Sequence, residues 1–129
     1  MGTNGNNGHK AQLLEQALRP ATDKPLVILL GGHPDECPET YALFSPITHI
    51  HAHCPPTLLI HGEDDTMVPV KTIRSLYTRL VKEKVPAVMH ILPQTDHAFD
   101  LILPKISPSA HNAIYDVESF LALLVNEVE

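Results

Sequence analysis

Apolar residues follow two patterns along the second half of the chain. Residues 57–61 and 87–92 are short runs that are almost continuously apolar, and each is bounded by proline or glycine. Such runs are typical of strands buried on both faces of a parallel sheet. Residues 69–84 carry apolar side chains three and four positions apart, which predicts an amphipathic helix, and a last helix is expected from about residue 107 onward. Strand, helix, strand and helix in this order indicate βαβ units, in which helices cover a parallel sheet.

Each of the two predicted helices has one apolar face. In the first helix, most lysine and arginine residues lie outside that face, and the proline at position 69 suits the first helical position. Apolar faces of this kind are the ones by which helices cover a sheet. The first face consists of Val70, Ile73, Leu76, Tyr77, Leu80 and Val81, and the last consists of Ile114, Val117, Phe120, Leu121, Leu124 and Val125.

The first 56 residues are less regular. Residues 1–10 are rich in glycine and asparagine and are expected to be disordered, whereas residues 11–18 are a short helix candidate. The apolar run 25–30 is too short for its periodicity to distinguish a buried strand from a helical turn. Residues 32–56 hold five of the twelve prolines, which predicts a loop-rich connector with one helical turn near residues 39–44.

Composition excludes several classes of protein. With 129 residues, 43% of them hydrophobic, the chain has the size of one globular domain with an ordinary core. A net charge of −6 provides no basic surface for nucleic acid or anionic lipid. No apolar run reaches the roughly 18 residues of a membrane span, and the first ten residues do not form a signal peptide, so a cytoplasmic location is expected. Cys37 and Cys54 lack C-x-x-C spacing, and isolated cysteines of this kind are more often reduced than paired.

Two residues with catalytic chemistry follow the two predicted strands. Asp65 comes directly after the first strand and His97 after the second, so both should lie at the same edge of a parallel sheet. A carboxylate in that place can orient an imidazole and stabilise the imidazolium when it accepts a proton. A lone aspartate after a strand is more often a turn or cap residue, but the strand and the matching histidine favour catalysis for Asp65. Asp64 is the rival carboxylate and is interpreted as a solvated neighbour, and His61 is expected to lie against the Asp65 loop as a structural residue.

From about residue 45 to its end, the sequence resembles the C-terminal part of α/β-hydrolases. The nearest group is the esterases and lipases related to feruloyl and other carboxylesterases and to prolyl-peptidase-like hydrolases. Residues 29–41 also resemble the connector between cap and core in that family. The matching segments are S-P-I-T at 45–48, P-P-T-L-L-I-H-G-E-D-D-T-M-V-P at 55–69, D-H-A-F-D at 96–100 and the last helix with its Phe-Leu pair at 120–121.

The resemblance implies a fold, a domain division and two site residues. The fold is α/β, a partial α/β-hydrolase with parallel strands and flanking helices that form the C-terminal half of the sheet only. The implied domains are a disordered segment at 1–10, a cap or connector remnant at 11–54, and the part with the acid and the histidine at 55–129. In the family patterns H-G-x-x-D-x-x-V-P and H-x-F, the catalytic acid and histidine fall on Asp65 and His97.

The nucleophile of such a triad is missing from these residues. The pattern G-x-S-x-G occurs nowhere, no glycine follows Gly62, and none of the five serines lies in a strand, tight turn and helix arrangement. We therefore expect this chain to be the C-terminal portion of a serine hydrolase. Once the N-terminal half completes it, the enzyme would act on small-molecule carboxylic esters without a cofactor. The chain alone is expected to be inactive. The alternative is a non-catalytic remnant that acts as a binding module or forms homo-oligomers through its exposed sheet edge.

The alternating histidines at 49, 51 and 53, followed by Cys54, allow a third interpretation. On an extended segment, alternation places three imidazoles on one side, where they could bind zinc or nickel. A metal site also needs an ordered second shell, and this segment is a proline-rich loop. Three solvated histidines are therefore the favoured interpretation, and no metal site is expected.

Overall fold

The computed structural model describes residues 23–101 and 105–126. The helix expected at residues 11–18 and the disorder expected at 1–10 lie outside these ranges. Contacts divide the chain into two units, residues 1–51 and 52–129, and each unit is described by itself.

The first unit contains short helices. The run that the sequence left undecided is the helix α2 (Asp23–Leu30), and it ends at Gly31, whose φ of +84° is a left-handed conformation open to glycine. The predicted helical turn is the helix α3 (Pro38–Phe44), and a 3₁₀ turn, η1 (Pro46–His49), follows it. Tyr41 of α3 is only 3% exposed, and its hydroxyl donates a hydrogen bond of 3.0 Å to the Gly32 carbonyl.

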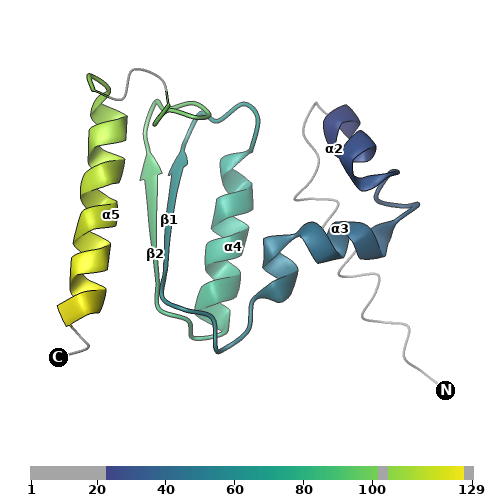
Figure 1. Ribbon diagram of the computed structural model, residues 1–129, viewed down its shortest axis with the longest axis horizontal. Helices are drawn as coiled ribbons and strands as arrows, with labels where there is room; N and C mark the ends of the chain where they lie inside the picture. Colours follow the sequence, from purple (N-terminus) through teal and green to yellow (C-terminus); the bar gives the residue numbers. More distant parts are fainter. Residues whose placement is uncertain (1–22, 102–104, 127–129) are drawn as a thin grey trace. The chain divides into compact units, whose positions relative to one another are not determined.

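The second unit is the predicted strand, helix, strand and helix. The strands β1 (Thr57–Gly62) and β2 (Ala87–Leu92) pair in parallel, with Thr57 opposite Ala87 and Gly62 opposite Leu92. The helices α4 (Val70–Lys82) and α5 (Pro108–Asn126) lie on opposite sides of the two strands (Figure 1). The unit is therefore a partial α/β fold with two parallel strands and flanking helices, as the sequence predicts.

The helix α4 ends two residues earlier than the sequence predicts. Lys84 has a left-handed φ of 60°, its amide donates to the Val81 carbonyl, and the Val85 amide donates to the Leu80 carbonyl, both at 3.0 Å. These two hydrogen bonds form a Schellman cap, in which the residue after the helix leaves the helical conformation. Leu80 and Val85 are 3% and 4% exposed, so the two apolar residues that the second bond joins are both buried at the end of α4.

The apolar stripe predicted for α5 is only partly covered. The buried residues of this helix are Ala110 and Ala113 near its start, whereas Ile114, Leu121 and Val125 are 51–67% exposed. Nineteen helical residues span about 28 Å, whereas a six-residue strand spans about 20 Å, so part of the helix extends past the strands. Among the described residues the sheet has two strands, too few to cover the whole face of α5.

Candidate active site

Asp65 lies in the loop between β1 and α4, residues 63–69, which we call the acid loop. Its carboxylate is 4% exposed. One oxygen, Oδ1, accepts hydrogen bonds from the amides of Met67 (2.9 Å) and Val68 (2.6 Å). A short side chain that binds the amides two and three residues onward fixes its own loop, which is why aspartate suits this turn before a helix. The other oxygen, Oδ2, is left to contact a residue from another loop.

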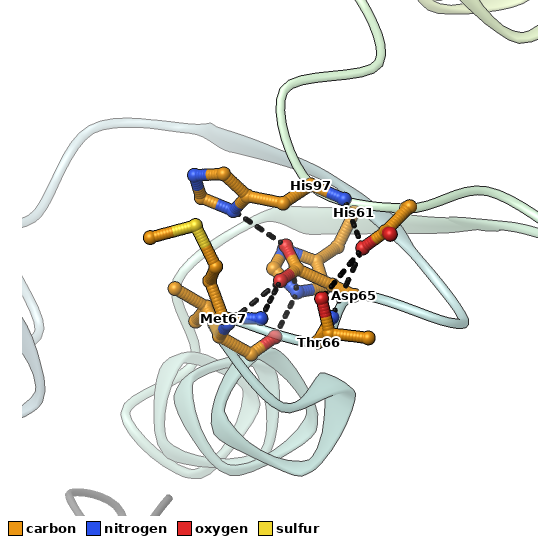
Figure 2. A network of polar contacts seen from close by, with 7 residues as sticks. His61, Asp65, Thr66, Met67 and His97 are labelled. Carbon is orange, nitrogen blue, oxygen red and sulfur yellow. Dashed lines mark hydrogen bonds and ion pairs between the residues drawn. The ribbon is translucent and has the colours of Figure 1, made fainter. Parts of the chain in front are cut away.

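That residue is His97, in the loop that follows β2, residues 93–100, which we call the histidine loop. His97 Nδ1 lies 3.0 Å from Asp65 Oδ2, so an Nδ1–H donates to the carboxylate. Figure 2 shows the second ring nitrogen, Nε2, on the side of the ring away from Asp65. The His97 side chain is 40% exposed, so the buried carboxylate orients an imidazole whose Nε2 is open to a reacting group.

The two loops meet because their strands end side by side. The Glu63 amide donates to the Leu92 carbonyl at 2.8 Å, and the Asp64 amide donates to the Thr95 carbonyl at 3.0 Å. Gly62 lies so close to the histidine loop that a Cβ built on it would be 2.2 Å from the Thr95 carbonyl oxygen. The glycine of the H-G pattern is thus the residue that lets the acid loop and the histidine loop approach one another.

Thr95 fixes the histidine loop from the other side. It is 4% exposed, and its hydroxyl donates to the Pro93 carbonyl at 2.8 Å and lies 2.8 Å from the Ser109 hydroxyl at the start of α5. The histidine loop is therefore closed by a bond within itself and tied to the start of α5, which restricts where His97 can lie.

Two opposing effects act on the pKa of the Asp65 carboxyl. Burial acts to raise this pKa, whereas hydrogen bonds from the Val68 amide, the His97 ring and the Met67 amide act to lower it. The hydrogen bonds together outweigh burial, so the pKa of Asp65 lies below its ordinary value. The carboxylate is ionised at neutral pH and can stabilise a positive charge on His97.

Two further polar residues support the acid loop. His61 Nε2 lies 2.8 Å from the Val68 carbonyl oxygen and 3.4 Å from Asp65 Oδ2, which agrees with the structural role expected for it. Asp96 accepts hydrogen bonds from Thr66 and from the His97 amide, a role that the sequence analysis missed. Its position directly before the histidine of the D-H-A-F segment was the signal available.

The other candidates take no part in this arrangement. Asp64 is exposed, as its interpretation as a solvated neighbour requires. All five serines lie in described residues, and none is hydrogen-bonded to His97; Ser107 instead accepts from the Ala110 amide at the start of α5. Phe99 faces α5 and lines a cavity of about 550 Å³ that neither Asp65 nor His97 borders.

The alternating histidines at 49, 51 and 53 are the remaining candidates. Among the described residues, no group of three or more histidine, cysteine, aspartate or glutamate side chains is placed to hold a metal ion. His49, the last residue of η1, places its Nε2 atom 2.7 Å from the Leu43 carbonyl oxygen. None of the described helices has both the length and the apolar character needed to cross a bilayer.

Comparison with known proteins finds relatives that are named as esterases. Over 85 residues it is 44% identical to the probable carboxylic ester hydrolase LipM of Mycobacterium tuberculosis, a match that covers 65% of this chain and 19% of LipM. Over 96 residues it is 34% identical to the esterase LipC of the same organism, which covers 73% of this chain and 22% of LipC. The chain thus spans about a fifth of the length of these relatives.

A solved structure and a family model agree with these relatives. A truncated form of a carbohydrate esterase from gut microbiota superimposes with a TM-score of 0.54 at 24% identity, over 67% of this chain and 34% of that one, which shows the shared fold. The family model BD-FAE matches residues 9–80, more than half of the chain, and the matched stretch includes Asp65 and ends before His97. The chain belongs to the BD-FAE family, whose fold is of the α/β-hydrolase type, in agreement with the resemblance seen in its sequence.

Proposed function

We propose that this chain is the C-terminal portion of a serine hydrolase that cleaves carboxylic esters, with Asp65 and His97 as the acid and the base of its triad. The observation that carries the proposal is the 3.0 Å hydrogen bond from His97 Nδ1 to a carboxylate that is 4% exposed. The names of the relatives, carboxylic ester hydrolase and esterase, support the reaction class. The pattern G-x-S-x-G does not occur in the 129 residues, so in this proposal the nucleophilic serine is supplied from outside them.

In the proposed mechanism each residue has its own step. His97 Nε2 takes the proton of the serine hydroxyl as that oxygen attacks the ester carbonyl, and it then donates the proton to the departing alcohol. Asp65 keeps the other proton on Nδ1 and stabilises the imidazolium between these two transfers. Water then releases the acid from the acyl-serine by the same two transfers, and no metal or organic cofactor is required. In this proposal residues 11–54 are a cap or connector remnant, and the protein is cytoplasmic.

The test is a segment exchange with an active relative. The matched segment of LipM is replaced by the corresponding residues of this chain, and hydrolysis of a p-nitrophenyl ester is measured. Asp65→Asn should lower kcat by roughly 10³- to 10⁴-fold and His97→Gln by at least as much, because triad members act as a unit. The matched control is Asp64→Asn, which removes a neighbouring exposed carboxylate and should leave kcat within about twofold.

Two results would contradict the proposed function. The first is a folded chimaera, judged by circular dichroism, that binds the ester but does not turn it over. The second is an Asp65→Asn chimaera that retains more than about a tenth of the parent activity, since a triad acid cannot be removed at so small a cost.

A second candidate function is self-association without catalysis. Leu121, Leu123 and Val125 of α5 are 53–67% exposed, and among the described residues β1 pairs only with β2, which leaves its other edge open. An open strand edge beside an apolar surface favours contacts between copies of a chain. Sedimentation equilibrium of the full chain tests this alternative: a mass that rises with concentration and falls after Leu121→Lys supports it, and a constant monomer mass rejects it.

A further inference from the structure

We propose that Asp96 is a positioning residue that couples the acid loop to the histidine loop and thereby holds Asp65 against His97. The inference deepens the proposed function and rests on it in one respect, namely that Asp65 and His97 are the working pair. It concerns neighbours of that pair along the chain, since Asp96 directly precedes His97 and its partner Thr66 directly follows Asp65.

One oxygen of Asp96 collects three hydrogen bonds. Its Oδ1 atom accepts from the Thr66 amide at 3.0 Å, from the Thr66 hydroxyl at 3.2 Å and from the His97 amide at 2.7 Å. Two of these donors belong to the acid loop and one to the histidine loop, and the residues joined are 30 positions apart. Asp96 is therefore a direct polar link between the two chain segments that carry Asp65 and His97.

Apart from the bond between Asp65 and His97 itself, the other hydrogen bonds described between the loops lie nearer the sheet. The Glu63 and Asp64 amides bind the Leu92 and Thr95 carbonyls, which fixes the base of each loop. Neither bond restrains the chain beyond Asp65, and the Thr66 amide is attached to that residue directly. If Asp96 were removed, Thr66 could move with respect to the histidine loop, and the Asp65 carboxylate would move with it. Sites of this kind lose function with displacements of about 0.5 Å.

The histidine loop contains a strained residue directly after His97. Ala98, directly after His97, has a φ of 53°, a left-handed conformation that residues other than glycine rarely adopt. Such a conformation persists only where neighbouring contacts enforce it. The short bond from the His97 amide to Asp96 is one such contact, so Asp96 stabilises the turn that presents the imidazole.

The negative charge of Asp96 contributes to this link. Hydrogen bonds from the His97 amide and the Thr66 amide hold the pKa of the Asp96 carboxyl below its ordinary value, so the group is ionised at neutral pH. Asparagine keeps an oxygen in the same place but lacks the charge. Asp96→Asn should therefore preserve most of the link, whereas Asp96→Ala should abolish it.

The experiment measures the proton that His97 shares with Asp65. In the ¹⁵N-labelled full chain, exchange of the His97 Nδ1–H with water is followed by NMR at neutral pH and low temperature. Asp96→Ala should accelerate this exchange about tenfold or abolish the signal, and Asp96→Asn should change it less than about threefold. The matched control is Asp64→Ala, which removes an exposed carboxylate one residue before Asp65 and should leave the exchange unchanged.

The exchange rates of the variants show whether Asp96 holds Asp65 against His97. An exchange rate in folded Asp96→Ala equal to that of the parent overturns it, and so does an equal effect of Asp64→Ala. If Asp96→Ala does not fold, Thr66→Val decides instead, because this variant removes only the 3.2 Å hydroxyl bond: an acceleration of about threefold supports the link, and no change overturns it. The readout needs no serine, so an inactive segment exchange would refute the proposed function and leave this result standing, and the reverse also holds.

Discussion

Gly62→Ala adds one methyl group where the acid loop and the histidine loop cross. The new Cβ would lie 2.2 Å from the Thr95 carbonyl oxygen and 2.8 Å from its carbonyl carbon, whereas non-bonded atoms rest about 3.5 Å apart. The obstacle is backbone, which cannot rotate away as a side-chain tip can. Thr95 also cannot retreat easily, because it is 4% exposed and bound to Pro93 and Ser109. The two loops must therefore separate by about 1 Å.

Separation of the loops lowers the free energy of unfolding in two ways. It breaks the 3.0 Å bond from the Asp64 amide to the Thr95 carbonyl, and a polar group left unpaired in a buried place costs about 1–3 kcal/mol. Overpacking adds roughly 1–3 kcal/mol. We therefore expect Gly62→Ala to lower the free energy of unfolding by about 2–6 kcal/mol and to lengthen the bond between Asp65 and His97.

Urea unfolding measured by circular dichroism gives the change in stability, and the His97 Nδ1–H signal reports the pair. Gly31→Ala is the control. Gly31 has a φ of +84°, which strains any residue other than glycine, but a Cβ built on it meets no atom within 4 Å, so this variant has the strain without the clash. Its conformational cost should be about 1 kcal/mol, with no effect on His97. A loss below about 1 kcal/mol in Gly62→Ala, with the His97 signal unchanged, would refute the steric reasoning.

Three further predictions concern stability. Lys84→Gly should raise the free energy of unfolding by about 0.5–1 kcal/mol, because Lys84 has a φ of 60° at the end of α4 where glycine carries no strain; a loss of stability in urea would contradict this. Because the pKa of Asp65 is lowered in the fold, its stabilising effect is complete above the pKa of the unfolded chain and is lost as pH falls through the folded value. Urea midpoints between about pH 5 and pH 2 should thus fall less steeply in Asp65→Asn than in the parent, and parallel profiles would reject the assignment. His90 on β2 is hydrogen-bonded to Asp116 on α5, and a double-mutant cycle with His90→Gln and Asp116→Asn should give a coupling of about 0.5–1 kcal/mol, modest because the His90 side chain is 41% exposed; a coupling of zero would show that the contact does not hold α5.

The parts of the fold that the sequence predicts are those with a strong local signal. β2 begins and ends where its apolar run does, and Asp65 and His97 were singled out because each follows such a run. The parallel register then brings the two residues together without any further information from the sequence.

The remainder depends on contacts between distant segments. The link from Asp96 to Thr66 joins residues 30 positions apart and leaves no periodic trace in the sequence. The apolar run at 25–30 is compatible with a buried strand and with a helix. Six residues are too few for their periodicity to show that the run is helical. The extent to which α5 is covered depends on how many strands lie beneath it, which the spacing of its own apolar residues cannot reveal.

The central claim is that Asp65 orients His97 so that its Nε2 atom can act as a base. The most direct test is to determine which ring nitrogen carries the proton when His97 is neutral. Long-range ¹H–¹⁵N correlation spectra of the full chain distinguish the two neutral forms of the imidazole. We expect the form with the proton on Nδ1, donated to Asp65, and with Nε2 unprotonated, and we expect Asp65→Asn to remove this preference. A neutral ring protonated on Nε2, or a form unaffected by Asp65→Asn, would show that Asp65 does not orient His97 as a base.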